Sequence, residues 1–158
     1  MKVTPETVAA EKHRLHRNAN QYVKLINDCR AHLGDLFETD VGKTTVDAFR
    51  EEVDIVFANG DRAANLTGFI QLLRLVDVSA DYPGYVVDEI LGREIAATIV
   101  DTQPERLLAE ATFHVFDVQH NPATASAGED DLDAAIAAGF QTRMEGWPWR
   151  ATPSPFSP

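Results

Sequence analysis

Apolar side chains recur in steps of three and four residues over the first part of the chain. With one interruption, at Lys12, the stripe between positions 5 and 33 consists of Val8, Leu15, Ala19, Tyr22, Ile26, Cys29 and Leu33. Thr4 can cap a helix that has Pro5 in its first turn, and Gly34 can end it. The pattern predicts one long helix over 5–33, with a narrow stripe that suits antiparallel packing or a coiled-coil seam.

The same periodicity predicts four further helices. They are expected over about 44–58, 62–77, 85–100 and 103–118. The alternation over 113–118 also fits a short strand, but a helix is favoured. Leu36 and Phe37, in the connection that follows the long helix, are expected to lie in the core.

The last 40 residues differ in composition from the rest. Residues 119–129 are small and polar, which is typical of a linker, and a short Ala-rich helix is expected next, over about 130–138. Four prolines then predict an extended segment, because proline fixes φ and lacks an N–H donor. The predicted organisation is all-α, with a bundle of about five main helices over 1–118, a linker and short sixth helix over 119–140, and an extended tail over 141–158.

The chain has the composition of an ordinary globular domain, with 158 residues of which 44% are apolar and 25% charged. Its 25 acidic and 14 basic residues give a net charge of −11, which opposes nucleic-acid binding. The basic run Lys12–Arg17 is interpreted as a solvated helix face. A single cysteine, no leader-like apolar segment and no stretch of about 20 apolar residues favour a cytoplasmic protein outside the membrane.

Several short motifs are incomplete as chemical sites. Residues 42–44, Gly-Lys-Thr, match the end of a phosphate-binding loop, but Phe37 stands where that loop needs its first glycine. His13 and His16 are three apart on one predicted helix and lack further ligands for zinc. Cys29 falls on the apolar stripe and is expected to be a small buried hydrophobe. The sequence therefore predicts no metal site and no catalytic residue from these motifs.

Glu51 and Asp54 form a carboxylate pair at i, i+3 on the predicted helix 44–58. Two such pairs on neighbouring helices can hold Mg²⁺ together with substrate phosphates. The pair resembles one half of the paired carboxylate motifs of all-α nucleotide pyrophosphatases. That resemblance implies a Mg²⁺-dependent hydrolase acting on a nucleotide or another phosphorylated small molecule. The upstream half of the motif is absent, and a solvated helix face is the simpler interpretation.

The predicted tail carries the most distinctive feature, Gly-Trp-Pro-Trp-Arg at 146–150. In an extended chain the two tryptophans point to the same side, and Trp and Arg are typical anchors of binding sites. The predicted partner-binding residues are therefore Trp147, Pro148, Trp149 and Arg150, whether they dock on their own domain or on another chain.

The leading hypothesis from the sequence is a non-catalytic subunit or adaptor of a larger assembly. It would bind a protein partner, or a second copy, through the tail and the seam of the first helix, without a cofactor. The alternative is the Mg²⁺-dependent hydrolase that uses Glu51 and Asp54.

Overall fold

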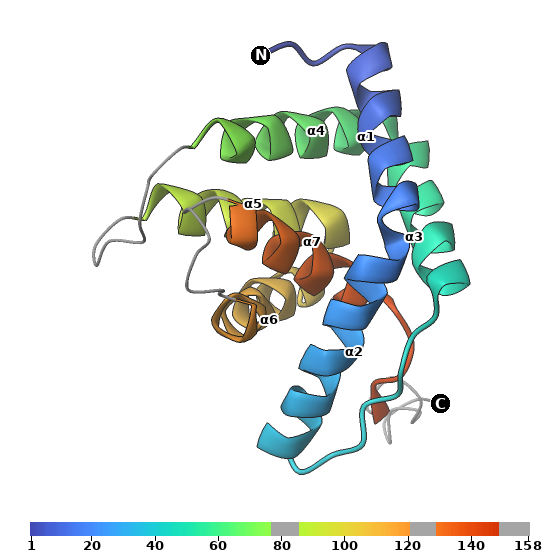
Figure 1. Ribbon diagram of the computed structural model, residues 1–158, viewed down its shortest axis with the longest axis vertical. Coiled ribbons are helices and arrows are strands. Elements are labelled where there is room, and N and C mark those ends of the chain that lie inside the picture. The colour runs from blue at the N-terminus through green and yellow to red at the C-terminus, as the bar shows by residue number, and fades with distance from the viewer. Residues whose placement is uncertain (77–85, 121–128, 149–158) are drawn as a thin grey trace.

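The computed structural model describes residues 1–76, 86–120 and 129–148 of the chain. These residues form seven helices and no strand, which confirms the predicted all-α class (Figure 1). The helices are α1 (Pro5–Arg17), α2 (Ala19–Leu36), α3 (Val46–Ala58), α4 (Gly60–Leu75), α5 (Val87–Val100), α6 (Glu105–Gln119) and α7 (Glu129–Arg143). Within the described ranges, none of the helices combines the length and the apolar character that crossing a bilayer requires.

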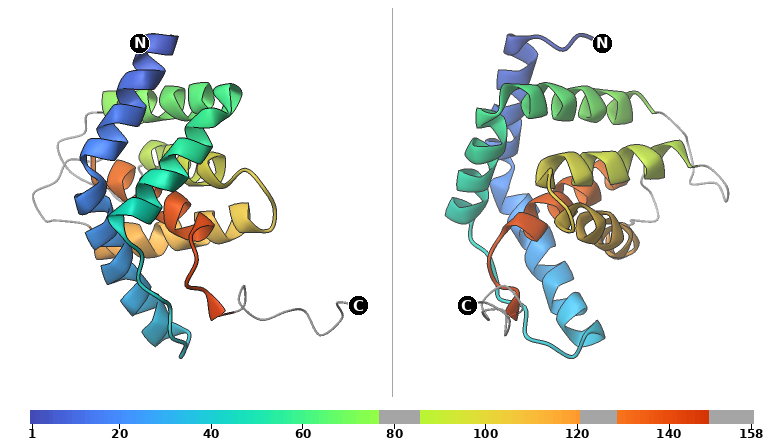
Figure 2. Two further views of the ribbon diagram at one scale, coloured as in Figure 1. Left: turned by 90° about the vertical axis from the view of Figure 1, so that its right-hand side faces the viewer. Right: turned by 180° about the vertical axis from the view of Figure 1, so that it is seen from behind.

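The first two helices form a curved column along one side of the molecule, and α4 to α7 run across it (Figures 1 and 2). Helices α4 and α5 lie side by side, and α5, α6 and α7 pack closely on one another. Helix α3 lies alongside the column and connects it to α4. The core is therefore enclosed by the column on one side and by the transverse helices on the other.

The long helix predicted over 5–33 is divided at Asn18, which ends α1 and begins α2 with φ −96° and ψ 14°. Asparagine is a poor residue for a helix interior because its side chain competes for backbone hydrogen bonds. The bend lets α1 contact α3 and α4, while α2 contacts α7. The apolar stripe from Leu15 to Leu33 is at most 2% exposed. The seam is thus used inside the chain and is not open to a partner.

The predicted short sixth helix is longer than expected and lies at the centre of the fold. It extends to Arg143, through Gly139, and Ala134, Ala135, Ala137 and Ala138 have no exposed surface. A helix buried on all sides needs no polar face, so it shows no amphipathic stripe. A Cβ atom at Gly139 would lie 2.8 Å from Ile99 of α5, so glycine permits close packing there. Helix α7 therefore belongs to the bundle, packed on α5 and α6.

The prediction that Leu36 and Phe37 are buried is wrong, because their exposed fractions are 57% and 65%. Helix α2 ends at Leu36, and the next turn takes Glu38 to a φ of +51°. The Thr39 amide then bonds to the Gly34 carbonyl at 2.9 Å. This turn leads the chain back, so that Val41 enters the core instead.

Candidate functional site

The segment that begins the predicted tail is bound to the core by a buried arginine. Arg30 of α2 is 1% exposed. Its Nη1 donates to the carbonyls of Gly42 at 2.6 Å and Glu145 at 2.7 Å, and its Nη2 donates to that of Gln141 at 2.8 Å. The guanidinium group thereby joins α2, the loop before α3 and the C-terminal end of α7, where a cation also suits the helix dipole.

Trp147 packs against this arginine and is only 5% exposed. The Arg30 Cζ atom lies 5.6 Å from the centre of the indole ring, within the range of a cation–π contact. The chain reaches this position through Gly146, whose φ of +113° and contacts leave no room for a side chain. Trp147 therefore docks on its own domain, one of the two alternatives that the sequence left open, and partner binding through this residue stays a prediction. Pro148 is exposed, and Trp149 and Arg150 lie outside the described residues.

The structure gives Glu51 and Asp54 different surroundings. The Asp54 Oδ1 atom is 2.8 Å from His16 Nε2 and 3.2 Å from Lys12 Nζ, both on α1. Slight desolvation opposes ionisation of this carboxyl, but the contacts with Lys12 and His16 lower its pKa overall. Asp54 thus helps to hold α1 against α3, and Glu51 faces a cavity instead. The same pairs neutralise part of the basic run Lys12–Arg17.

That cavity, of about 490 Å³, lies between the loop before α3, α3 itself and the end of α7. Its polar lining consists mainly of Lys43, Thr44, Thr45, Glu51, Glu52 and Glu145. Thr45 caps α3 by accepting a hydrogen bond from the Ala48 amide at 3.2 Å, so the positive end of this helix borders the cavity. Lys43 and Thr44 of the Gly-Lys-Thr motif, Glu51 and the start of the tail, which are far apart in sequence, therefore meet here.

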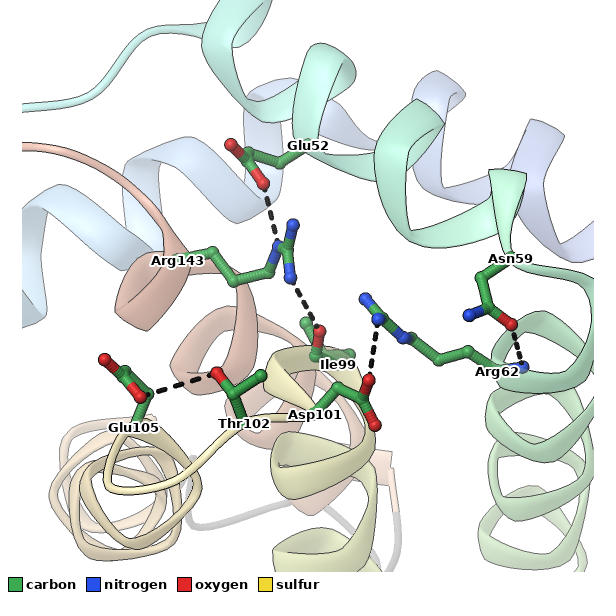
Figure 3. A network of polar contacts seen from close by, with 8 residues as sticks. All are labelled: Glu52, Asn59, Arg62, Ile99, Asp101, Thr102, Glu105 and Arg143. Atoms are coloured by element: carbon green, nitrogen blue, oxygen red, sulfur yellow. Dashed lines mark hydrogen bonds and ion pairs between the residues drawn. The ribbon is translucent and has the colours of Figure 1, made fainter.

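Polar contacts join Glu52 of this cavity to α7 and α5, and a further ion pair lies close to them (Figure 3). The Glu52 carboxylate accepts from Arg143 Nε at 2.8 Å, and Arg143 Nη1 donates to the Ile99 carbonyl at 3.3 Å. Close by, Arg62 of α4 bonds to Asp101 at the end of α5, at 2.8 Å. Because Glu52 is held by Arg143, the carboxylates left to face the cavity are those of Glu51 and Glu145.

A second group of acids lies at the other end of α7. Asp88 and Asp131 are 4% and 5% exposed, and Asp117 of α6 adjoins them. Burial, followed by the neighbouring Asp117 and Asp88 carboxylates, raises the pKa of Asp131 to about 10. Asp131 is therefore protonated at neutral pH and can donate a hydrogen bond to its neighbours. Across the described ranges, no three His, Cys, Asp or Glu side chains are grouped so as to hold a metal ion.

Large apolar side chains are exposed where α4 ends and α5 begins. This α4–α5 apolar surface consists of Leu72, Leu75, Val86, Val87 and Ile90, with exposed fractions between 39% and 67%. The two helices pack on each other and their ends lie on the same side of the molecule (Figure 1). The sequence pattern did not reveal this surface. These residues continue apolar patterns whose other members, such as Leu73 and Ile95, are buried, so the pattern alone does not separate exposed from buried positions.

Comparisons with known proteins place the chain in a family. No curated protein and no solved structure matches it. The profile of a family described as a domain of unknown function, DUF7984, matches residues 1–158. This match covers the whole sequence, and the chain belongs to the DUF7984 family.

Proposed function

We propose that the protein is a non-catalytic subunit or adaptor of a larger assembly, and that it binds a protein partner through the α4–α5 apolar surface. The observation that carries the proposal is the exposure, between 39% and 67%, of five large aliphatic side chains at one end of the helix pair. Exposed apolar side chains are typical of contact sites where they adjoin, because burial of their surface contributes about 25 cal/mol per Å².

The charge of the chain indicates the chemistry of the partner. With a net charge of −11, two copies repel each other, whereas a basic surface is attracted. Glu89, next to Ile90 in the chain, adds a 43% exposed carboxylate to the first turn of α5. The proposed partner is therefore a different protein that presents an apolar contact area with basic residues around it.

This proposal moves the contact away from the two surfaces that the sequence favoured. The seam of α1 and α2 and the Trp147 ring are already covered within the chain. Binding by Trp149 and Arg150 stays a prediction, as does a cytoplasmic location.

A matched pair of double variants tests the proposal. Leu75→Gln/Ile90→Gln removes apolar character from the proposed surface, and Leu107→Gln/Val118→Gln does the same at exposed positions of α6. Each tagged chain is purified from its native cells, and co-purifying proteins are quantified by mass spectrometry. We expect one stoichiometric basic protein with the wild type and the α6 variant, but not with the α4–α5 variant. Equal recovery with all three chains contradicts the proposal, and a second copy recovered in its place contradicts the proposed partner.

A Mg²⁺-dependent hydrolase acting on a phosphorylated small molecule is a second candidate. The specific observation in its favour is that Glu51 and Glu145 share the 490 Å³ cavity with Lys43 and the capped start of α3. Magnesium commonly uses one or two carboxylates together with substrate phosphates, and lysine and helix N-termini bind phosphate. Asp54 has no part in this version, because it is paired with α1.

The second candidate is tested by measuring phosphate release from a panel of nucleoside triphosphates and sugar phosphates with Mg²⁺ present. Glu51→Gln is expected to reduce the rate at least tenfold, and Glu38→Gln, an exposed carboxylate outside the cavity, to leave it unchanged. No Mg²⁺-dependent release above the buffer rate, or equal rates in both variants, would reject the hydrolase.

A further inference from the structure

A second polar cavity, of about 460 Å³, lies where the start of α4 meets the end of α5 and the start of α6. Asn59, Asp61 and Arg62 line it from the first turn of α4, Thr98 and Asp101 from α5 and its cap, and Arg106 from α6. Its two guanidinium groups come from helices that are distant in sequence. Two arginines and two aspartates thus line one cavity of a chain whose net charge is −11.

Arg62 is held in place while part of its hydrogen-bonding capacity stays unused. Its Nη2 donates to the Asp101 carboxylate at 2.8 Å, and its side chain is 16% exposed (Figure 3). The Nε–H group is buried and has no hydrogen-bond partner among the described residues. A guanidinium group offers five N–H donors in a planar arrangement. When it is largely desolvated and has a single partner, its hydrogen bonds offset little of the desolvation cost. The Arg62 guanidinium is therefore held in orientation by Asp101, and it has hydrogen-bond donors that no residue of the described ranges uses.

Arg106 brings a second cation to the same cavity. Its side chain is half-buried, and within the described part of the chain its guanidinium has no hydrogen-bond or ion-pair partner. Asn59 caps α4 by accepting from the Arg62 amide at 3.0 Å, so the positive end of α4 also borders the cavity. Two arginines and a helix N-terminus are the groups that recognise oxyanions in proteins.

The acids of the cavity set the charge of the ligand. Asp101, held at a φ of +73° at the end of α5, keeps Arg62 oriented, and Asp61 lies in the first turn of α4. These two carboxylates balance the two arginines, so the lining accepts one negative group more readily than several. The Asn65 amide and the Thr98 hydroxyl offer hydrogen bonds to the uncharged remainder of the ligand.

We propose that this cavity binds a small molecule with a single oxyanion group, a phosphate or a carboxylate, clamped between Arg62 and Arg106. Asp101 acts as a positioning residue for Arg62. The site is separate from the α4–α5 apolar surface and from the cavity at Glu51, so it stands or fails independently of the functions proposed above.

The test is a titration of the full chain with inorganic phosphate and with acetate, followed through backbone amide shifts at constant ionic strength. We expect saturable shifts of the Gly60, Asp61 and Arg62 amides with at least one anion, and the anion that binds identifies the oxyanion class. Arg106→Gln should weaken binding about tenfold or more, because a charge-assisted contact is lost. Arg17→Gln removes an equal charge at an exposed position of α1, and this variant should bind the anion as tightly as the wild type does.

Linear shifts with both anions, or equal affinities in the Arg106→Gln and Arg17→Gln variants, would overturn the proposal. Arg106 is replaced, and not Arg62, because Arg62 bonds to Asp101 at the end of α5. The Arg106 substitution leaves this ion pair intact. Unfolding curves of both variants confirm that the comparison is made on folded chains.

Discussion

The two ends of α7 show two ways of burying charge in the centre of a helical bundle. At its C-terminal end, the cation of Arg30 meets the carbonyls of Gln141, Glu145 and Gly42. At its N-terminal end, Asp131 lies beside other carboxylates, and its pKa rises to about 10. At the C-terminal end, hydrogen bonds offset the desolvation of the buried cation. At the N-terminal end, the cost of burying several carboxylates is reduced because one of these acids stays protonated. The contrast shows that the identity of a buried ionisable residue does not tell whether it stabilises the fold. Its neighbours decide this, because they determine whether the side chain is charged.

The strongest test of this contrast is Arg30→Met, which removes the cation and keeps an apolar stem. Several buried carbonyls would lose their donors, so we expect a loss of about 3–5 kcal/mol in the free energy of unfolding. Urea denaturation measures the change, with Arg17→Met as an exposed control expected within about 0.5 kcal/mol. Similar stabilities of the two variants would show that Arg30 is not a brace.

Gly146→Ala tests the backbone conformation that lets the chain pass close to Arg30 after the C-terminal end of α7. A Cβ atom there would lie 2.6 Å from Arg30 Nη1 and 2.8 Å from the Gly42 carbonyl oxygen, at a φ of +113°. We expect a loss of about 1–3 kcal/mol on chemical unfolding. Gly60→Ala is the control, since a Cβ atom at Gly60 has no neighbour within 4 Å. It should be neutral or stabilising by up to about 1 kcal/mol.

At the N-terminal end of α7, replacing the ionisable residue Asp131 should increase the free energy of unfolding and not decrease it. The raised pKa of Asp131 means that its protonated form favours the folded state fully below about pH 4. This contribution is lost as the pH rises towards 10, because the unfolded chain gives up the proton first. Asp131→Asn keeps a hydrogen-bond donor without a titration, so it should be about 1–3 kcal/mol more stable than the wild type at pH 8.

The difference between Asp131→Asn and the wild type should shrink at pH 4–5, as measured by urea denaturation across this pH range. Asp40→Asn, an exposed change of the same kind, serves as the control. If the difference in the free energy of unfolding does not vary with pH, Asp131 does not have a raised pKa in the folded state.

The last test concerns Cys29, which is a member of the apolar stripe of α2. Its side chain is 1% exposed, and burial, with a contribution from Asp28, raises the pKa of the thiol to about 12. The native thiol should therefore react with iodoacetamide at pH 8 about 100-fold more slowly than in urea. Arg30→Met, one residue on, should increase the native rate if the brace also limits local opening.

Helix capping was predictable from sequence where the cap is local. Thr4 caps α1, and its capping box closes on Thr7 at 2.9 and 3.3 Å. Asn59 and Asp61 are both suitable cap residues at the start of α4, and the structure uses Asn59. Residues 102–105 have the spacing of a capping box, but the Thr102 side chain bonds only to that of Glu105, at 3.4 Å, and no side chain caps α6.

The candidate sites were predictable only as fragments. Lys43, Glu51 and Trp147 each drew attention in the sequence, but their relation follows from the loop that Asn27 holds, through two hydrogen bonds with Thr44 at 2.9 and 3.1 Å. Arg62 and Arg106 carried no motif at all. Their convergence depends on how α4 and α6 meet the end of α5, which no local pattern encodes.

The sequence by itself determined that this is an all-α protein and approximately where most helices lie, because periodicity and caps act over a few residues. The tertiary structure decided which helix is central, where the first helix breaks and which polar residues meet. The Ala-rich α7 is the clearest case, with Ala135 and Ala138 fully buried. Small side chains contribute little to a hydrophobic pattern, and their importance lies in the close approach that they allow between α5, α6 and α7.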